Sequence, residues 1–560
     1  MRVLLAAFLL VSGFLAGCAS TSSPTPTSGA PLVTQANPDW AVKAIFAGAD
    51  PLDTDHAPEH DHANRSLHKG LSTPNFEVQG HNGITSGYFE QPAGTYYCGD
   101  VSAGPRQIAV VHSFQTDVAI EVLDVTNRSN VQALGELVLP YVFTYDAAIF
   151  SDASYAVIAG NPDLASDKPP IAAMRAEAER TGRVPFQPQW RDACGNLHAM
   201  KSNVDSIPYG YSAILVDLSD PTNPTVASFY EYPGGRNVHS ISTALIDGTR
   251  YVVTSGLMAI PCTLPSITGN PVANPVPCEP QVPRFGNALS HFDFLTVTDV
   301  GPRHQLTPYL VYIPTDQAHL DPSLLYLSNG HTDATLEKHP VTNQLIAYLA
   351  DWDGGLHIIR LDGPQQATAL TTWGQQPGSD PTQMNGHIHS ASPVPGLRDG
   401  KHLLVVGQEV IGRPGGRSSG QVAIVDVTNP AVVLRLAKWT LPLDVQWPPS
   451  QGEMFSTHYA ILVNDTLYVS LYHGGVWAAD ARKANWPDLA SIGAFVPDGD
   501  PAGTVFRAGP TPEVLEVLAT GGDGNLLVFD GTTGAYTVHF TGVDPRVPPT
   551  TPWADNPWIG

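Results

Sequence analysis

A motif that recurs seven times constrains this 560-residue chain more than any other feature of its sequence. In each copy a short hydrophobic run ends at an aspartate, which is often followed by Thr-Asn-Pro or a related turn sequence. Such self-similarity indicates a repeat architecture, in which each copy is one supersecondary unit packed on its neighbours. The seven motif aspartates are Asp124, Asp217, Asp299, Asp362, Asp426, Asp480 and Asp530.

The spacing of these aspartates indicates the size of the repeated unit. Asp426 and Asp480 are 54 residues apart, and Asp480 and Asp530 are 50 apart, which is near the ~40–50 residues of a four-stranded propeller blade. The earlier copies are 63 to 93 residues apart, and they require insertions. The sequence offers these insertions at 161–210, 261–287 and 409–420. The rivals are a large β-sandwich and a solenoid, although solenoid repeats are usually only ~20–45 residues long.

Composition supports short strands and excludes several classes of function. The chain has 51 Gly and 51 Pro, and only 14% of its residues are charged, against ~25% in ordinary soluble domains. A hydrophobic content of 42% provides for a large core. The net charge of −24 argues against nucleic-acid binding, which needs clustered Lys and Arg. No phosphate-binding loop, H-E-x-x-H motif or dinucleotide-binding glycine motif occurs.

The best copy of the motif reads Val-Ala-Ile-Val-Asp-Val-Thr-Asn-Pro over 422–430. It resembles the LVIVD-type repeat of bacterial surface and periplasmic proteins. The resemblance implies an all-β fold, a seven-bladed β-propeller over residues 85–545, closed by pairing of its terminal strands. We expect one short helix in the first insertion, at Pro169–Gly182, because Pro begins this stretch and Gly ends it. Residues 546–560 form a Pro-rich tail.

The N-terminus has the pattern of an export signal. Arg2 precedes an apolar run over 3–14, which is too short to span a bilayer as a mature helix. The following Leu-Ala-Gly-Cys resembles the lipobox of bacterial lipoproteins, which implies a signal segment over 1–18 that is cleaved before a lipidated Cys18. Residues 19–84 then form a disordered tether and an N-terminal loop segment. We expect a monomer in the cell envelope that touches the membrane only through its lipid anchor.

Four cysteines remain once Cys18 carries the lipid. An even number outside the cytoplasm favours two disulfides, for which three pairings are possible. The preferred pairing joins Cys262 to Cys278, which would close a Pro-rich loop, and leaves Cys98 to pair with Cys194.

Histidines recur in step with the repeat. The segment that opens each of five successive blades carries His, Asp or Tyr within two residues of one position. Because equivalent positions of a propeller converge on its axis, their imidazoles would face a common centre and suit a transition metal such as Fe, Cu or Zn. The predicted metal ligands are His239, His331, His389 and His458. Asp333, Glu409 and Glu453 are candidates for fixing the imidazole tautomers through hydrogen bonds.

Two functions remain open at this point. The first is a metal-dependent oxidoreductase that binds a small molecule at an open coordination position. The second is a non-catalytic surface scaffold that binds protein or glycan through its blade-face loops, with the channel histidines serving structure alone. A seven-bladed propeller with axial histidines is similar, at the level of fold, to the selenium-binding/methanethiol oxidase proteins and to carotenoid-cleaving oxygenases. Likeness of fold does not transfer an activity.

Overall fold

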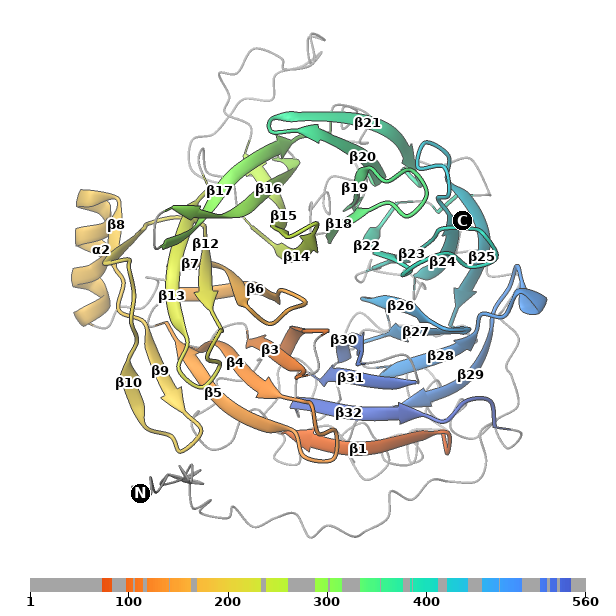
Figure 1. Cartoon of the computed structure of the whole chain (residues 1–560), viewed down its shortest axis with the longest axis horizontal. Helices are drawn as coiled ribbons and strands as arrows, with labels where there is room; N and C mark the ends of the chain where they lie inside the picture. Colours follow the sequence, from red (N-terminus) through yellow and green to blue (C-terminus); the bar gives the residue numbers. More distant parts are fainter. Residues whose placement is uncertain are drawn as a thin grey trace, which may run out of the picture.

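The structure, a computed structural model, is a ring of seven β-sheets whose innermost strands surround a central axis (Figure 1). The predicted seven-bladed β-propeller is confirmed. The structure describes residues 73–544 except 83–96, 104–105, 114–117, 140–141, 163–168, 233–237, 260–287, 301–302, 315–332, 353, 376–382, 385, 411–419, 442–455, 473, 496–513, 521–523 and 531–533.

Blades 3 to 6 are each built from four consecutive antiparallel strands, numbered outward from the axis. Blade 3 contains β14 (Ser240–Ile246), β15 (Thr249–Ala259), β16 (Ala288–Val300) and β17 (Arg303–Tyr312). Blade 4 contains β18 (Ala334–Lys338), β19 (Leu345–Asp351), β20 (Gly355–Gly363) and β21 (Gln366–Trp373). Blade 5 contains β22 (Ile388–Pro393), β23 (Leu403–Gln408), β24 (Gln421–Asp426) and β25 (Leu434–Thr440). Blade 6 contains β26 (Ala460–Val463), β27 (Thr466–Ser470), β28 (Val476–Asp480) and β29 (Ala490–Phe495), with a short 3₁₀ helix at Lys483–Asn485.

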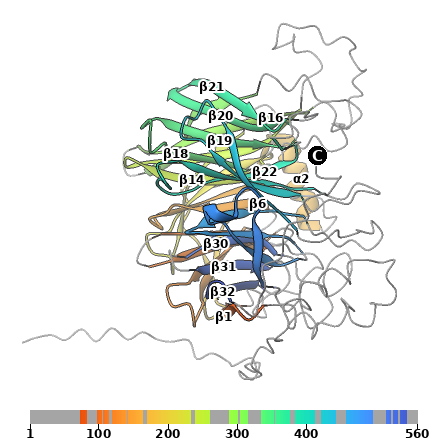
Figure 2. The ribbon, with the colours of Figure 1, turned by 90° about the vertical axis from the view of Figure 1, so that its right-hand side faces the viewer.

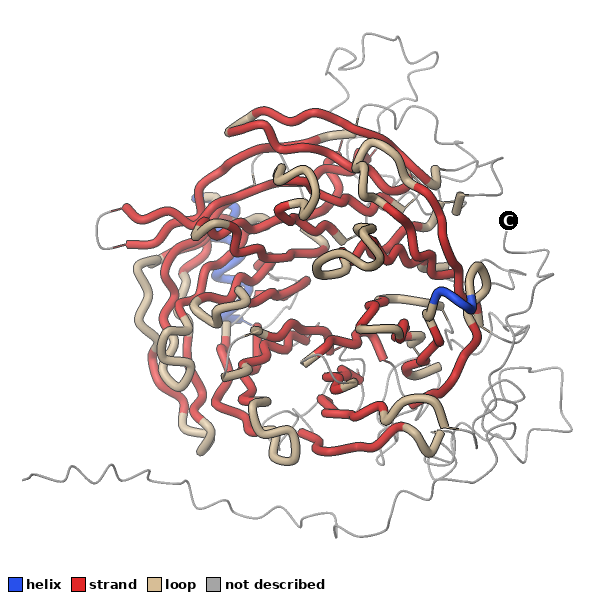
Figure 3. Tube along the Cα trace, turned by 45° about the vertical axis from the view of Figure 1, so that its right-hand side comes forward, coloured by secondary structure: helices blue, strands red, loops and turns tan. Residues whose placement is uncertain are grey.

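The predicted insertion lies in blade 2, between its second and third strands. Its helix, α2 (Pro169–Thr181), confirms the prediction and lies at the rim of the ring (Figures 1 and 3). Blade 2 contains β6 (Val142–Ile149), β7 (Tyr155–Pro162), β12 (Ser212–Asp217) and β13 (Thr225–Glu231), and the insertion adds the pair β8 (Arg183–Pro185) and β11 (Ser206–Pro208). A second hairpin of the insertion, β9 (Gln189–Asp192) and β10 (Leu197–Ala199), extends the outer edge of blade 1, which contains β2 (Tyr97–Val101), β3 (Ile108–Ser113), β4 (Val118–Asp124) and β5 (Gln132–Val138).

The ring is closed by strands from the two ends of the described chain. Blade 7 has the order β1-β32-β31-β30, in which β30 (Val514–Ala519) is innermost and β1 (Phe76–Asn82) is outermost. The strand β1 pairs with β32 (Gly534–Phe540), which follows β31 (Asn525–Asp530). Closure by terminal strands agrees with the prediction. The propeller nevertheless begins before the predicted boundary at residue 85, since β1 falls within the segment that was expected to be a tether or loop.

The strands form at the hydrophobic runs of the sequence, and the distance of a strand from the axis determines how many of its residues are buried. Each blade packs its two faces against its neighbours, as the edge-on view in Figure 2 shows, so inner strands are buried on both sides. In blade 5 every residue of β23 and β24 is buried, whereas β25 begins at an exposed residue and is only partly buried at several others. Between blades 5 and 6, the rings of Trp439 and Trp477 lie 6.3 Å apart within one hydrophobic cluster. The core is therefore a set of layers between blades.

Six of the seven motif aspartates lie at or next to the ends of third strands, whereas Asp530 ends β31, the second strand of blade 7. In four blades the carboxylate accepts the backbone N–H two residues further on, which turns the chain toward the fourth strand. These bonds join Asp124 to Thr126 at 3.0 Å, Asp217 to Ser219 at 2.9 Å, Asp426 to Thr428 at 2.9 Å and Asp480 to Arg482 at 3.1 Å.

The strand order bears on one of the two predicted disulfides. Cys98 lies on β2 and Cys194 follows β9, and these strands are four steps apart in the sheet of blade 1. Four steps of ~4.8 Å separate them by roughly 19 Å, whereas the Cα atoms of a disulfide lie within ~7 Å. Cys194 is disulfide-bonded, and this order separates it from the strand of Cys98. Cys18, Cys262 and Cys278, the signal segment 1–18 and the tail 546–560 lie outside the described residues.

Candidate metal centre

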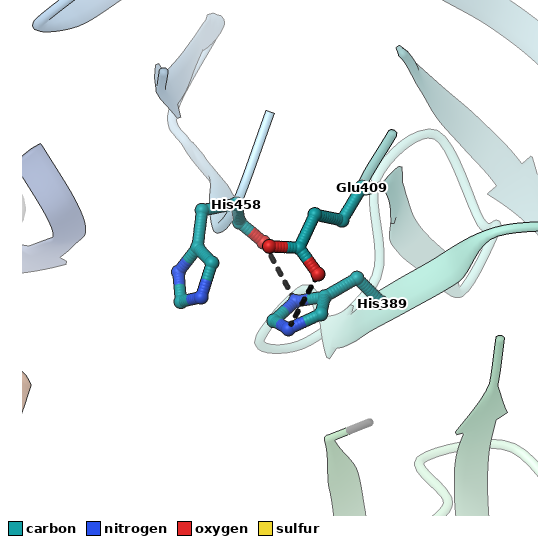
Figure 4. Close-up of side chains that lie close together, drawn as sticks. All are labelled: His389, Glu409 and His458. Atoms are coloured by element: carbon teal, nitrogen blue, oxygen red, sulfur yellow. Dashed lines mark hydrogen bonds and ion pairs between the residues drawn. The ribbon is translucent and has the colours of Figure 1, made fainter. Parts of the chain in front are cut away.

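Three of the predicted site residues meet beside the axis, where blades 5 and 6 adjoin. His389 belongs to β22, the innermost strand of blade 5, and Glu409 directly follows β23. His458 precedes β26, the innermost strand of blade 6. Since β22 and β23 are antiparallel, the start of one and the end of the other lie at the same face of the ring. The ligand atoms of the three side chains all lie within 4.8 Å of one another (Figure 4).

Hydrogen bonding sets the tautomer of His389. Its Nδ1 lies 3.0 Å from the backbone oxygen of His458, and a carbonyl can only accept, so Nδ1 carries the proton. The lone pair of the neutral ring is then on Nε2, which lies 3.5 Å from Oε2 of Glu409. The dashed lines in Figure 4 mark these two interactions. A backbone carbonyl that orients a ligating imidazole in this way is common around metal sites.

Burial tunes both groups. His389 and Glu409 are 7% and 3% exposed, and His458 is half-buried. Desolvation lowers the pKa of His389 to about 4, although its hydrogen bond to the His458 carbonyl opposes the shift. Desolvation also raises the pKa of Glu409, opposed by the nearby His458 and by a hydrogen bond from Tyr472. His389 is therefore neutral at pH 7, as a metal ligand must be, and a cation would offset the cost of burying the carboxylate.

The geometry fits a first-row metal ion with little movement. Bonds of ~2.0–2.2 Å from imidazole nitrogen and carboxylate oxygen allow two ligand atoms to be at most ~4.4 Å apart. The separations here reach no more than 4.8 Å, so a shift of a few tenths of an ångström would bring all three atoms onto one ion. The rings of His389 and His458 are 4.4 Å apart and tilted by 42°.

Surrounding residues fix the acidic member of the group. The backbone N–H of Glu409 donates to the carbonyl of His387 at 2.8 Å, and Trp352 Nε1 donates to the carbonyl of Glu409 at 2.9 Å. The Tyr472 hydroxyl donates to Oε1 of Glu409. Sequence reasoning missed Tyr472, which lies after the second strand of blade 6 and not in an opening segment. The sequence feature that could have identified Tyr472 is its position directly before the His-Gly-Gly turn of blade 6.

The other predicted residues have different positions. His239 precedes β14 in blade 3, and its N–H donates to Ser255 at 2.8 Å, but it is not part of the group of three. Asp333 contacts the group through its backbone, since its N–H donates to the carbonyl of His389 at 3.0 Å. His331 and Glu453 lie outside the described residues. Glu409, expected only to support the imidazoles, instead offers a ligand atom itself.

Aspartates occupy corresponding innermost positions in other blades and join neighbours together. Asp100 accepts the N–H of Ile149 at 3.0 Å from blade 2, and Asp146 accepts that of Ile241 at 2.7 Å from blade 3. Desolvation, with repulsion from Asp146, raises the pKa of Asp100 to about 6 and that of Asp333 to about 7. These hydrogen bonds to backbone groups identify Asp100 and Asp146 as links between blades.

Two buried histidines pair with aspartates away from the group of three. His112 Nε2 lies 3.2 Å from Asp146, and His291 Nδ1 lies 2.8 Å from Asp293. Both His291 and Asp293 are fully buried within blade 3. These contacts give His112 and His291 a structural role within the propeller. Among the described residues, only His389, Glu409 and His458 form a group that could hold a metal ion.

Comparison with known proteins adds likeness of fold alone. No family model and no curated protein sequence matches the chain. Among solved structures it is similar to Sqt1 of Saccharomyces cerevisiae, with 10% identity, a TM-score of 0.40, and coverage of 81% of this chain and 97% of that one. It is also similar to the Cps50 (Swd1) β-propeller domain of Myceliophteria thermophila, with 10% identity, a TM-score of 0.38, and coverage of 83% and 98%. The WD40 β-propeller domain of Doa1 gives 8% identity, a TM-score of 0.34, and coverage of 83% and 97%. No helix of the described residues is long and apolar enough to cross a membrane.

Proposed function

We propose that this chain is a metal-dependent oxidoreductase of the bacterial cell envelope that acts on a small molecule at the axial site of His389, Glu409 and His458. The observation that supports this proposal is the group of two imidazoles and one carboxylate that two adjacent blades contribute. Two His and one carboxylate with open positions is the ligand set typical of non-haem iron(II) oxygenases. Zinc accepts the same three ligand types, so we place iron(II) first and zinc second.

We further propose that the chain is a lipoprotein with LVIVD-type repeats, anchored through Cys18. The lipobox-like Leu-Ala-Gly-Cys supports the anchor, and the recurring aspartate turn supports the repeat assignment. Incorporation of radiolabelled palmitate by cells producing the wild type, and its loss in Cys18→Ala, tests the anchor separately from the metal site.

Metal analysis of the purified protein tests the site directly. After anaerobic purification and passage over a desalting column, we expect one firmly held transition-metal ion per chain. The double variant His389→Ala/His458→Ala should lose this ion. The matched control is His198→Ala/His304→Ala, since these two histidines are exposed and pair with Asp192 and Asp299 at the surface. Equal metal content in both variants would refute the proposed site.

A non-catalytic scaffold is the second candidate, and one observation favours it. Large apolar side chains of blade 5 are exposed in the turns at the other end of the blade, including Leu397 at 49% and Val432 at 45% exposure. Leu397 follows the end of β22, whereas His389 lies near its start, so these side chains and the metal group lie at opposite faces of the ring. Absence of bound metal in the wild type would favour this candidate.

A further inference from the structure

We infer that Tyr472 is the residue that positions Glu409 so that only Oε2 binds the metal ion. The inference rests on the proposed function, because it concerns how that site is assembled. It makes Tyr472 a positioning residue: its hydroxyl acts on Glu409, and Glu409 acts on the metal. The consequence is a coordination position left open for a small molecule.

The backbone of Tyr472 is held in an unusual conformation by its neighbours. Its φ angle of 44° lies in the left-handed region, which is rare for a bulky side chain and is kept only where the surroundings enforce it. Tyr472 forms an isolated β-bridge with Val514, whose N–H donates to the Tyr472 carbonyl at 2.9 Å. Since Val514 begins the innermost strand of blade 7, the ring closure itself holds Tyr472 in place.

The main chain of Glu409 is fixed independently of Tyr472. It is held by the bonds to His387 and Trp352 described above, and the next residue, Val410, donates its N–H to Ser456 Oγ at 2.6 Å. The remaining freedom of Glu409 is rotation of its side chain. The Tyr472 hydroxyl removes that freedom by donating to Oε1.

The two carboxylate oxygens therefore have separate tasks. Oε1 faces the phenol, and Oε2 faces Nε2 of His389 at 3.5 Å. Tyr472 also packs edge-on against His458, with ring centroids 5.0 Å apart. One aromatic residue thus touches two of the three proposed ligands. A carboxylate with one oxygen engaged in this way binds an ion through the other, and each ligand atom withheld leaves room for substrate.

Cobalt(II) provides a spectroscopic test, because its visible ligand-field bands weaken as the coordination number rises. We compare metal-depleted wild type, Tyr472→Phe and the control Tyr468→Phe by titration with Co²⁺. Tyr468 is buried in the same blade, where its ring packs 5.7 Å from that of Phe540. We expect Tyr472→Phe to weaken Co²⁺ binding by about 10–100-fold and to weaken the bands, since Oε1 becomes free to bind. Tyr468→Phe should match the wild type.

A double-mutant cycle separates positioning from a general loss of structure. If Tyr472 acts through Glu409, replacing Tyr472 by Phe in a Glu409→Ala background, which has no acceptor for the hydroxyl, should change Co²⁺ affinity by less than about twofold. A full effect in that background would overturn the inference, as would a Tyr472→Phe variant with wild-type affinity and spectrum. An intense tyrosinate charge-transfer band with Fe³⁺ would also overturn it, by making Tyr472 a ligand. Failure of the wild type to bind Co²⁺ would instead refute the proposed metal site.

Discussion

Folding raises the pKa of several buried carboxyl groups in the described part of this protein. On blade 1, Glu121 and Glu136 are directly opposite each other on β4 and β5 and are 2% and 5% exposed. Desolvation raises the pKa of Glu136 to about 7, although Arg191 at 3.2 Å opposes the shift. Desolvation and the nearby Glu136 raise the pKa of Glu121 well above its ordinary value.

This pair predicts that stability falls as the pH rises. A carboxyl group whose pKa is raised by folding favours its protonated form in the native state, so its contribution is complete below pH ~4.5 and is lost as the pH passes the folded value. A shift to about 7 for Glu136 corresponds to roughly 3 kcal/mol. Glu121→Gln should therefore flatten the decline between pH 5 and pH 8, measured by urea unfolding. The control is Glu179→Gln on the exposed face of α2, and parallel curves for the two variants would contradict the prediction.

At the candidate site, the sequence predicts ligands only where they lie in the opening segments of the blades. His389 and His458 were predicted because both lie in opening segments, which converge on the axis in any propeller. Glu409 was predicted only in a supporting role, and no repeat pattern marks its position directly after a second strand. Tyr472 reaches the site through a left-handed backbone conformation and a bridge to blade 7. Neither feature can be predicted from the hydrophobic periodicity of the sequence.

Among the elements, the third strands of blades 1 to 6 are the best determined by sequence, because an aspartate lies at or next to the end of each. At Asp426 the carboxylate accepts the Thr428 N–H at 2.9 Å and its hydroxyl at 2.5 Å, and it also pairs with Lys401. Other elements carry no such signal. The β9–β10 hairpin joins blade 1 although its residues belong to the insertion of blade 2, and short strands alone do not specify which sheet edge they extend.

The turn predicts a graded loss of stability at Asp426. Asp426→Ala should lower the free energy of unfolding by about 1–3 kcal/mol, since two acceptor bonds and a charged partner disappear together. Asp426→Asn should lower it less, because an amide oxygen still accepts the Thr428 N–H. Guanidinium unfolding of both variants beside the wild type gives the measurement. Equal losses for Ala and Asn would show that the charge alone matters and that the turn bond contributes nothing.

At the scale of the whole molecule, closure of the seven-bladed ring determines how the blades and the candidate site are positioned. The count of blades followed from the seven aspartates, but the closing strand did not. The strand β1 has no motif aspartate and precedes the first repeat, and its partner β32 lies more than 400 residues away. The pairing of β1 with β32 closes the ring. The strand β1 covers the outer edge of blade 7 and packs Phe76 against Phe540, with ring centroids 4.9 Å apart.

Truncation isolates the contribution of β1. We expect a chain lacking residues 1–82 to unfold several degrees below a chain lacking residues 1–72, because only the first lacks β1 and the layer of side chains it buries. Thermal unfolding followed by circular dichroism measures the difference. Limited proteolysis should then cut the shorter chain first near β32, whose outer edge is uncovered. Identical melting curves would show that blade 7 is stable with three strands.

The metal site also belongs to the whole molecule, because its ligands connect two blades that packing and hydrogen bonds also join. An ion bound only by the native state stabilises it by about 2.7 kcal/mol when its free concentration is 100 times the dissociation constant. We therefore expect chelation to lower the melting temperature by a few degrees and added metal to restore it, as measured by scanning calorimetry. In His389→Ala/His458→Ala neither treatment should shift the transition. A shift of equal size in that variant would mean that the stabilising ion binds elsewhere, and the junction of blades 5 and 6 would then be held by its tryptophans and backbone hydrogen bonds alone.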